Sequence, residues 1–475
     1  MNSDNNTLNG SFWQSFNYQV IKRGTEISYL RKIPCLYLPP PQHNTCFSRE
    51  KEEMGVDLRQ VVAGILTITM FVMLGQMLHR DYFDSLQEKA QGDAHDIEFE
   101  GSRVSVKDSL VGALEGSKGP WMDDNNDLNP CWPTLLSDEA VSSKGYVTFS
   151  LTNGPEYHIS QITDAVMVAK HLGATLVLPD IRGSKPGDER NFEDIYDADK
   201  LIKSLEKVIK VVKQLPEEVS LRDMAIIKVP TRVTEDYIKE NIDPIFKSKG
   251  NIRVATYFPS VNLRKSSQDG ETDPVACLAM FGSLELQPEL NAVVESMVER
   301  LRTHSRKLGD RFIAVDLRID LLEKKHCHST GVVGSKTCYN AQEIALFLRK
   351  LGFAGDTTIY LTQPRWDSSL DILKDIFPKT FTKEAIFPAS KKSKYLESES
   401  SEYENVIDFY ISSRSDVFVP AISGLFYANI VGKRIALGKP QVLVPAEISE
   451  TSGLATDFIS PYISKKNHLA YSCFC

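Results

Sequence analysis

Short apolar runs alternate with amphipathic stretches along the chain from about residue 145 onward. The run at residues 145–151 is followed by a helical pattern over 159–172 and by a second apolar run at 174–179. Apolar runs of this length are typical of buried strands, and the spacing of the stretch between them is helical. Strand, helix and strand in this order predict a βαβ unit with a parallel sheet.

The same alternation returns in the second half of the chain. An amphipathic pattern over residues 290–308 leads into the apolar run 312–317, which predicts a helix followed by an inner parallel strand. Asn340 and Glu343 have the spacing of a capping box at the start of another helix. The predicted fold class is therefore α/β, in two halves. Further strands are predicted near residues 225–229, 254–258, 276–281, 358–362 and 415–420.

One segment before these halves is apolar enough to cross a membrane. Residues 61–78 are uncharged and have about the shortest length that spans a bilayer. Arg59 precedes the segment and acidic residues follow it, which favours a cytoplasmic N-terminus and a lumenal bulk. No small-residue cleavage site follows, so a single-pass type II signal anchor is predicted, with a buried core helix as the alternative. Residues 1–60 then form a largely disordered cytoplasmic tail and 79–143 a stem.

The first 53 residues are polar and Asn-rich, and they precede Met54. We expect them to be an upstream extension, with Met54 as the usual start. The short apolar segment suits the thinner membranes of the early secretory pathway and the Golgi apparatus better than the plasma membrane.

The net charge limits the classes of binding partner, and the cysteines indicate the redox compartment. The formal net charge is −8, which argues against nucleic acid as the main partner. Six of the eight cysteines follow the apolar segment, and in an oxidising lumen they can form disulfides. Six cysteines permit 15 pairings; a bond between Cys327 and Cys338 is favoured here, and two reduced, buried thiols are the alternative.

Arg318 is the leading candidate for a functional residue. It stands where the predicted strand 312–317 ends, and ligands of open α/β sheets bind beyond the carboxyl ends of the strands. Its guanidinium is a fork that can hold a diphosphate, although it can equally close the strand by pairing with Asp316 or Asp320. Asp197 and Asp199 have the spacing of a divalent-metal site, but Asp199 is better explained as the N-cap of a helix over residues 200–214, so no metal site is predicted.

Four segments in order resemble the plant branch of the O-fucosyltransferase-like glycosyltransferases, most closely its mannan-synthesis-related members. The resemblance covers about residues 140–440. The segments are TNGPEYHISQITDAVMVAKHLGATLVLPDIRG (152–183), NFEDIYDADKLIKSL (191–205), RFIAVDLRID (311–320) and SDVFVPAISGLFYANIVGKR (415–434).

This resemblance implies two Rossmann-like domains, at residues 144–305 and 306–475, that face each other across a cleft in the GT-B arrangement. It also implies an inverting, metal-independent sugar transfer in the Golgi lumen. The donor is a nucleotide sugar, GDP-mannose or GDP-fucose, and no other cofactor is implied. Arg318 matches the arginine of the family's His-Leu-Arg motif, which holds the donor diphosphate. The other donor contacts carried over are Gly154, Ser415, Asp416 and Phe418, and His158 is a candidate for the same cleft, with a packed core aromatic as the alternative.

Two positions depart from the family pattern. Asp316 stands where the family has histidine, and Glu156 stands where it has asparagine. Inversion needs a base for the acceptor hydroxyl, and either carboxylate is a candidate when desolvated in a cleft. Arg365 and Lys433-Arg434 are candidate helpers of Arg318 in balancing the charge of the leaving group.

These observations predict a glycosyltransferase of mannan biosynthesis with a cell-wall polysaccharide as acceptor. The contrasting hypothesis is a non-catalytic partner that stabilises or assists a mannan synthase. Carboxylates beside a diphosphate repel it, so Asp316 and Glu156 favour the partner, whereas a cleft that retains Arg318 and Asp416 favours the enzyme. A hydrolase is a distant third, because Asp316 and Asp320 point differently at a strand end.

Overall fold

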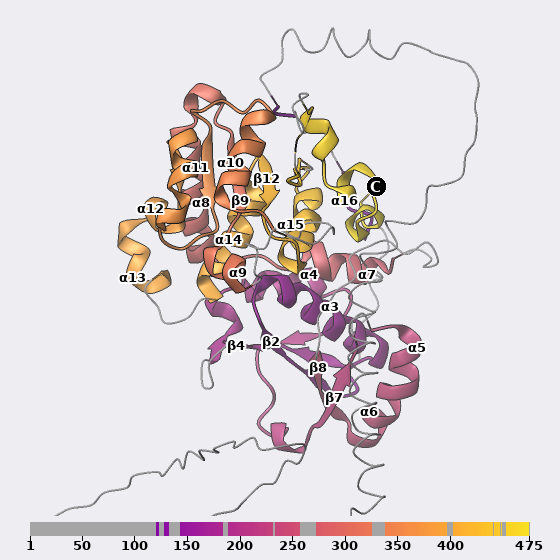
Figure 1. Cartoon of the computed structure of the whole chain (residues 1–475). Coiled ribbons are helices and arrows are strands. Elements are labelled where there is room, and N and C mark those ends of the chain that lie inside the picture. Colours follow the sequence, from indigo (N-terminus) through magenta and orange to yellow (C-terminus); the bar gives the residue numbers. More distant parts are fainter. Residues whose placement is uncertain are drawn as a thin grey trace, which may run out of the picture. The chain divides into compact units, whose positions relative to one another are not determined.

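The computed structural model describes much of the chain from residue 120 onward (Figure 1). The membrane-anchor prediction for residues 61–78 lies outside the described residues. Within the described part, no helix has both the length and the apolar character needed to cross a membrane. The described ranges are 120–122, 128–132, 143–183, 189–230, 233–256, 272–324, 338–396, 402–439, 441–446, 448 and 453–474.

The first half is built on a five-stranded sheet in which every described pairing is parallel, with the order β6-β3-β1-β8-β7. The predicted βαβ unit is confirmed: α3 (Pro155–Leu172) connects the first strands to β3. Gly173, in a left-handed conformation, ends α3. The strands are β1 (Tyr146–Thr148), β3 (Thr175–Val177), β6 (Val211–Val212), β7 (Ala225–Val229) and β8 (Asn251–Thr256).

The predicted strand at residues 145–151 is two strands in the structure. β1 pairs in the five-stranded sheet, whereas β2 (Ser150–Thr152) pairs in parallel with β4 (Asp180–Arg182). β4 also pairs antiparallel with β5 (Glu189–Asn191), so these three strands form a second, small sheet. β2 leads directly into the N-terminus of α3, which places that helix end at the carboxyl edge of the strands.

The second half is built on a four-stranded parallel sheet with the order β11-β10-β9-β12. The predicted inner strand is confirmed as β9 (Phe312–Asp316), in which all five residues are buried. Its apolar side chains are covered on both faces, as expected for a parallel strand between helices. The other strands are β10 (Thr358–Leu361), β11 (Thr380–Phe381) and β12 (Val417–Pro420).

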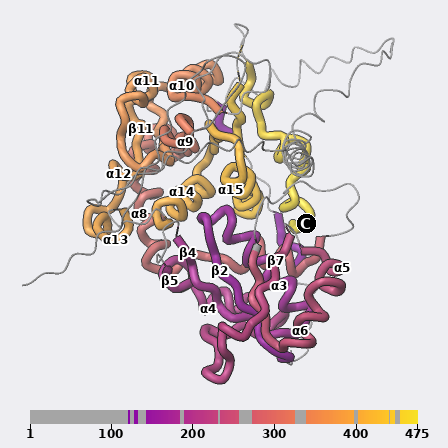
Figure 2. Tube along the Cα trace, turned by 60° about the horizontal axis from the view of Figure 1, so that its bottom comes forward, coloured from indigo at the N-terminus to yellow at the C-terminus, as the bar shows by residue number. Residues whose placement is uncertain are grey.

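The helices of the second half pack on this sheet and on the first half. The capping box predicted for Asn340 and Glu343 is confirmed at the start of α10. α3 packs against α14 and α15, so the helix that follows β2 lies beside the two helices that flank β12 (Figure 2). The helices are α8 (Pro288–His304), α9 (Ile319–Lys324), α10 (Ala341–Lys350), α11 (Asp371–Ile376), α12 (Lys383–Ile386), α13 (Lys392–Tyr395), α14 (Glu402–Arg414) and α15 (Leu425–Ala436).

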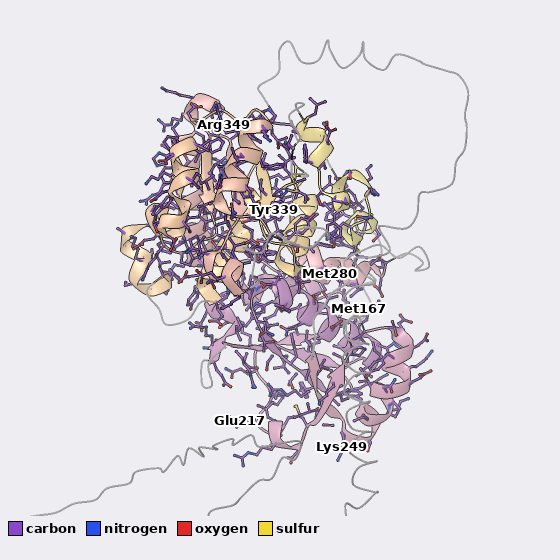
Figure 3. The ribbon with its side chains drawn as sticks, in the orientation of Figure 1. Met167, Glu217, Lys249, Met280, Tyr339 and Arg349 are labelled. Atoms are coloured by element: carbon purple, nitrogen blue, oxygen red, sulfur yellow. A yellow bond between two sulfur atoms is a disulfide. The ribbon has the colours of Figure 1, made fainter. Side chains whose placement is uncertain are left out.

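Two predicted elements are wrong. The apolar run 276–281 was expected to be a strand, but it forms α7 (Pro274–Cys277) and the π-helical turn η5 (Leu278–Gly282). This segment packs against α3, where Met280 of η5 and Met167 of α3 mark the two elements (Figure 3). A short apolar run does not distinguish a buried strand from a buried helix, and tertiary packing decided in favour of the helix.

The helix predicted over residues 200–214 is also shorter than expected. α4 spans Ala198–Leu205, and its N-cap is Asp197, whose side chain accepts a hydrogen bond from the Lys200 backbone N–H. Asp199 instead forms an ion pair with Lys213. One of the two aspartates is therefore the helix N-cap, as predicted, but it is Asp197 and not Asp199.

A disulfide between Cys277 and Cys473 joins α7 to the C-terminal segment across 196 residues of sequence. Cys131 and Cys338 are disulfide-bonded as well. Cys327, the predicted partner of Cys338, lies outside the described residues, so that pairing stays a prediction. A crosslink over so long a loop restricts the unfolded chain strongly.

Candidate active site

Arg318 lies just beyond the carboxyl end of β9, as predicted. Its guanidinium turns back to Asp316 and donates two hydrogen bonds, from Nε to Oδ1 at 3.1 Å and from Nη2 to Oδ2 at 3.3 Å. The other side of the guanidinium lies over the ring of Phe426, with 4.8 Å from Cζ to the ring centroid. Burial lowers the pKa of Arg318, but the carboxylates of Asp316, Asp408 and Glu156 outweigh it, so the guanidinium stays charged.

Asp316 is held on several sides. Besides the two bonds from Arg318, its Oδ1 accepts a hydrogen bond of 2.9 Å from the hydroxyl of Thr362, at the end of β10. The residue is buried, with 1% of its surface exposed. These three hydrogen bonds fix the carboxylate against the guanidinium and occupy both of its oxygens. Asp316 therefore orients Arg318.

Glu156 faces the same guanidinium from the first half of the chain. It is the second residue of α3, and its Oε2 atom is buried without a hydrogen-bond partner among the described residues. Burial raises the pKa of Glu156 to about 7, and Arg318 only partly offsets that effect. A carboxyl group with a pKa near neutrality can exchange a proton at physiological pH. Of the two carboxylates singled out from the sequence, Glu156 has the better properties for a base.

Gly154 leaves room for the Glu156 carboxylate at the start of α3. The residue has φ 103°, which favours glycine, and a Cβ atom built on it would lie 3.0 Å from Glu156 Oε2. Any side chain at this position would therefore strain the turn and press on the carboxylate. This close contact with Glu156 explains why the turn before α3 has a glycine at this position.

Two helix N-termini open toward this cluster. α3 begins after β2 at Gly154, and α15 begins after β12 at Gly424; neither has a side-chain cap. Uncapped backbone N–H groups at a helix N-terminus attract anions. Phe426, which lies against Arg318, is the second residue of α15, so the guanidinium and the start of α15 are neighbours.

A second layer of buried charges lies behind Arg318. Asp408 of α14 accepts a hydrogen bond of 2.5 Å from the hydroxyl of Tyr360 and pairs with Lys383 Nζ at 2.8 Å. Lys383 is itself 1% exposed and also contacts Glu404 at 3.2 Å. Burial raises the pKa of Asp408 to about 6, while Lys383 opposes the rise. Sequence reasoning missed this layer, because its members are scattered over three elements and share no local motif.

His158 is not open to a ligand in this structure. Its ring is fully buried, its Nδ1 lies 2.8 Å from the hydroxyl of Tyr196, and burial lowers its pKa to about 3. His158 is therefore a packed core residue in this structure, which was the alternative to a place in the donor cleft.

Two of the late-strand residues predicted as donor contacts, Ser415 and Asp416, lie at the opposite edge of the sheet from Arg318. The third, Phe418, lies inside β12, where it pairs with Ala314 in the middle of β9. Asp416 precedes β12, and its carboxylate accepts the backbone N–H of Phe312, the first residue of β9, at 2.9 Å. Arg318 follows the other end of that strand, which is about 13 Å long at the usual rise per residue. Ser415 and Phe418 are fully buried. A shared donor site for Arg318 with Ser415, Asp416 and Phe418 does not fit this geometry.

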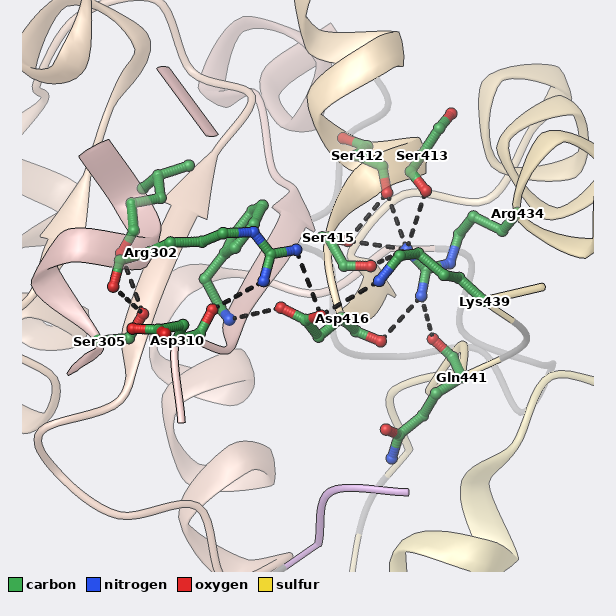
Figure 4. A network of polar contacts seen from close by, with 12 residues as sticks. Arg302, Ser305, Asp310, Ser412, Ser413, Ser415, Asp416, Arg434, Lys439 and Gln441 are labelled. Atoms are coloured by element: carbon green, nitrogen blue, oxygen red, sulfur yellow. Dashed lines mark hydrogen bonds and ion pairs between the residues drawn. The ribbon is translucent and has the colours of Figure 1, made fainter. Parts of the chain in front are cut away.

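Asp416 and Ser415 belong instead to a structural network around Arg434 (Figure 4). The Arg434 guanidinium is fully buried and donates hydrogen bonds to a set of acceptors at the end of α14 and beside β12. These acceptors are the carbonyls of Ser412, Ser413, Ser415, Asp416 and Gln441 and the hydroxyl of Ser415. Arg434 is therefore not available to assist Arg318, and Arg365 is exposed.

Residues 146–437 match the family described as GDP-fucose protein O-fucosyltransferase. The chain belongs to this family. Over 422 residues, 89% of this chain and the whole of the relative, it is 93% identical to Protein MANNAN SYNTHESIS-RELATED 1 of Arabidopsis thaliana. It is 45% identical, with the same coverage, to Protein MANNAN SYNTHESIS-RELATED of Trigonella foenum-graecum. Among solved structures, POFUT1 in complex with GDP covers 64% of this chain and 99% of its own, at 13% identity and a TM-score of 0.39.

Proposed function

We propose that the protein is an inverting glycosyltransferase of mannan biosynthesis that transfers a sugar from a GDP-sugar to a polysaccharide acceptor. The observation that carries the proposal is the interaction of the Arg318 guanidinium, whose side chain is 18% exposed, with the Glu156 carboxyl, whose pKa burial raises to about 7. Family membership supports the GDP-sugar donor, and the names of the relatives support the link to mannan synthesis.

In this proposal the two sheets face each other across the donor cleft, with Arg318 as the charge that holds the diphosphate. The uncapped N-termini of α3 and α15 add backbone N–H donors on the same side. When the bond from the sugar to the diphosphate breaks, negative charge grows on the leaving oxygen. Fixed positive groups stabilise that charge without a metal ion.

Glu156 takes the second role, as the base for the acceptor hydroxyl. The attacking oxygen must lose a proton as it bonds to the sugar carbon, and a carboxylate with a pKa near neutrality accepts it efficiently. The orphaned Oε2 atom of Glu156 offers a free lone pair for that proton. Asp316, already bonded to Arg318 and Thr362, keeps the guanidinium in place.

We also propose residence in the Golgi membrane as a single-pass type II protein, with residues 61–78 as the anchor. The disulfide between Cys277 and Cys473 supports an oxidising lumen for the folded part, because such bonds are rare in reducing compartments.

A non-catalytic partner of a mannan synthase is the second candidate function. It is favoured by the two hydrogen bonds that Arg318 donates to Asp316, since they occupy one edge of the fork that a diphosphate would use. In that case the fold is retained while transfer is lost.

A transfer assay distinguishes the two candidates. The purified full-length chain is incubated with GDP-mannose or GDP-fucose and manno-oligosaccharides, and glycosylated products are detected by mass spectrometry. The enzyme hypothesis predicts a product that disappears in Arg318→Ala and Glu156→Gln. A folded chain that forms no product, but raises the activity of a co-expressed mannan synthase, would establish the partner instead.

A further inference from the structure

Gln363 contacts the residue that follows Arg318, although it is two residues past the end of β10 and belongs to no sequence motif. Its side-chain Oε1 accepts the backbone N–H of Ile319, the residue that follows Arg318, at 3.0 Å. Its own backbone carbonyl accepts the N–H of Lys383, at the start of α12, at 3.2 Å. Gln363 is thus fixed by both its main chain and its side chain at the carboxyl edge of the sheet.

These contacts settle which way the amide is turned. Only an oxygen can accept the N–H of Ile319, so the carboxamide nitrogen must occupy the other position. Among the described residues no acceptor receives a hydrogen bond from that nitrogen, and Gln363 is only half-buried. The result is a pair of N–H donors that is held in place, has no partner among the described residues and lies on a half-exposed side chain.

The neighbours of Gln363 also belong to the cluster around Arg318. Thr362, one residue earlier, donates to Asp316, which in turn binds two nitrogens of Arg318. The end of β10 therefore fixes the guanidinium through Thr362 and Asp316, and fixes the turn after it through Gln363. Donors that are held in place before a ligand arrives bind it at a lower entropic cost.

We propose that Gln363 is a donor-binding residue, whose carboxamide N–H donates to an oxygen of the diphosphate that Arg318 holds. The inference rests on the proposed function and adds a second side chain to the diphosphate contact. It also answers the difficulty posed by Asp316: one edge of the Arg318 fork is occupied, and Gln363 supplies the missing donor next to it. A diphosphate oxygen suits this donor because neutral N–H groups bind anions without adding charge.

The substitution that isolates the N–H donor is Gln363→Glu. Glutamate keeps an oxygen to accept the Ile319 N–H and keeps the size of the side chain, but it loses both N–H donors. Gln363→Met is the matched variant, because it is uncharged and loses both the donor and the acceptor. Thermal unfolding of both variants reports on the turn, and we expect Gln363→Glu to unfold at the wild-type temperature while Gln363→Met unfolds earlier.

Calorimetric titration of the full-length chain with GDP and with guanosine gives the decisive readout. We expect Gln363→Glu to bind GDP about tenfold more weakly or worse, as for a lost hydrogen bond to a charged group, with guanosine affinity unchanged. The loss should persist at about 1 M salt, where the Debye length is about 3 Å and the repulsion from the new carboxylate is screened.

GDP affinity equal to wild type, or restored by high salt, overturns the role of Gln363 and leaves the proposed function standing. Weak binding by Gln363→Met alone shows that the residue only supports the turn, and also overturns the inference. If the folded wild-type chain binds no nucleotide, the proposed donor site fails, and the inference fails with it.

Discussion

Arg318 donates two hydrogen bonds to Asp316, two residues before it in the sequence, at the carboxyl end of strand β9. The pair fixes the guanidinium, whose charge also acts on Glu156 in the first half of the chain. It also assigns the two carboxylates different roles. Asp316 is bound by its neighbours, whereas Glu156 Oε2 has no partner among the described residues and carries a raised pKa.

Replacement of Glu156 by glutamine should separate chemistry from binding. The variant cannot accept a proton, so we expect transfer to fall by about a hundredfold or more, as for other general bases, while GDP-sugar affinity stays the same or improves because a negative charge is removed. In the wild type, kcat should rise with pH through a limb near pH 7, and this limb should be missing from any residual activity of the variant.

The stability of the same variant checks the pKa independently. A folded pKa of about 7 against a usual value of 4.5 means that Glu156 stabilises the fold fully below pH 4.5 and that this stability is lost as the pH rises to 7. At pH 8, Glu156→Gln should therefore be more stable than wild type by up to about 3 kcal/mol. Equal stability at pH 8 in urea unfolding would speak against a buried, ionised carboxylate.

Asp316→Asn should give the opposite kinetic pattern. The substitution removes the charge that binds Arg318 and places an amide beside the guanidinium, so the arginine loses its fixed orientation. We expect donor affinity to fall about tenfold with the limb near pH 7 preserved, because the base is intact. A variant that binds donor normally and has lost transfer would instead make Asp316 the base.

His158 should make the fold sensitive to mild acid. Burial lowers its pKa to about 3, against 6.5 in the unfolded chain, so the stability it contributes is present above pH 6.5 and is lost as the pH falls toward 3. At pH 5 the loss is about 2 kcal/mol. Chemical unfolding of His158→Phe should show a flatter decline between pH 6.5 and 5, whereas His171→Phe on the same helix should follow the wild type.

Arg434 should be required for folding of the second half. Its fully buried guanidinium satisfies several backbone carbonyls at the end of α14, so Arg434→Met leaves buried acceptors unpaired. We expect a loss of about 3 to 5 kcal/mol in the free energy of unfolding. Arg434→Lys should recover little, because an ammonium cannot reproduce the planar fork. Arg365→Met, at an exposed position, should change stability by less than about 0.5 kcal/mol.

The part of the fold that sequence could predict is local in origin. β9, its following arginine and the capping box at Asn340 each depend on residues within a few positions of one another. The strand expected at residues 276–281 was wrong, because a short apolar run does not reveal whether a sheet or a helix will cover it. The division of residues 145–151 between two sheets depends on which later strands pair with them.

The candidate site was predictable only in its first layer. Arg318, Asp316, Glu156 and Gly154 stand at the ends of predicted elements, where sequence motifs are informative. The layer of Asp408, Lys383 and Tyr360 forms through contacts between residues far apart in the sequence, so no sequence motif predicts it. Asp416 was misplaced because a residue before a strand lies at the amino edge of the sheet, away from the ligand-binding edge.

Binding of the nucleotide shows whether Arg318 forms a donor site. The purified full-length chain is titrated calorimetrically with GDP, UDP, GDP-mannose and GDP-fucose, beside Arg318→Ala and the exposed control Arg365→Ala. We expect selective binding of guanosine nucleotides that is lost in Arg318→Ala and kept in Arg365→Ala. A well-folded chain that binds none of these ligands, or binds them equally after Arg318→Ala, would contradict the proposed donor site.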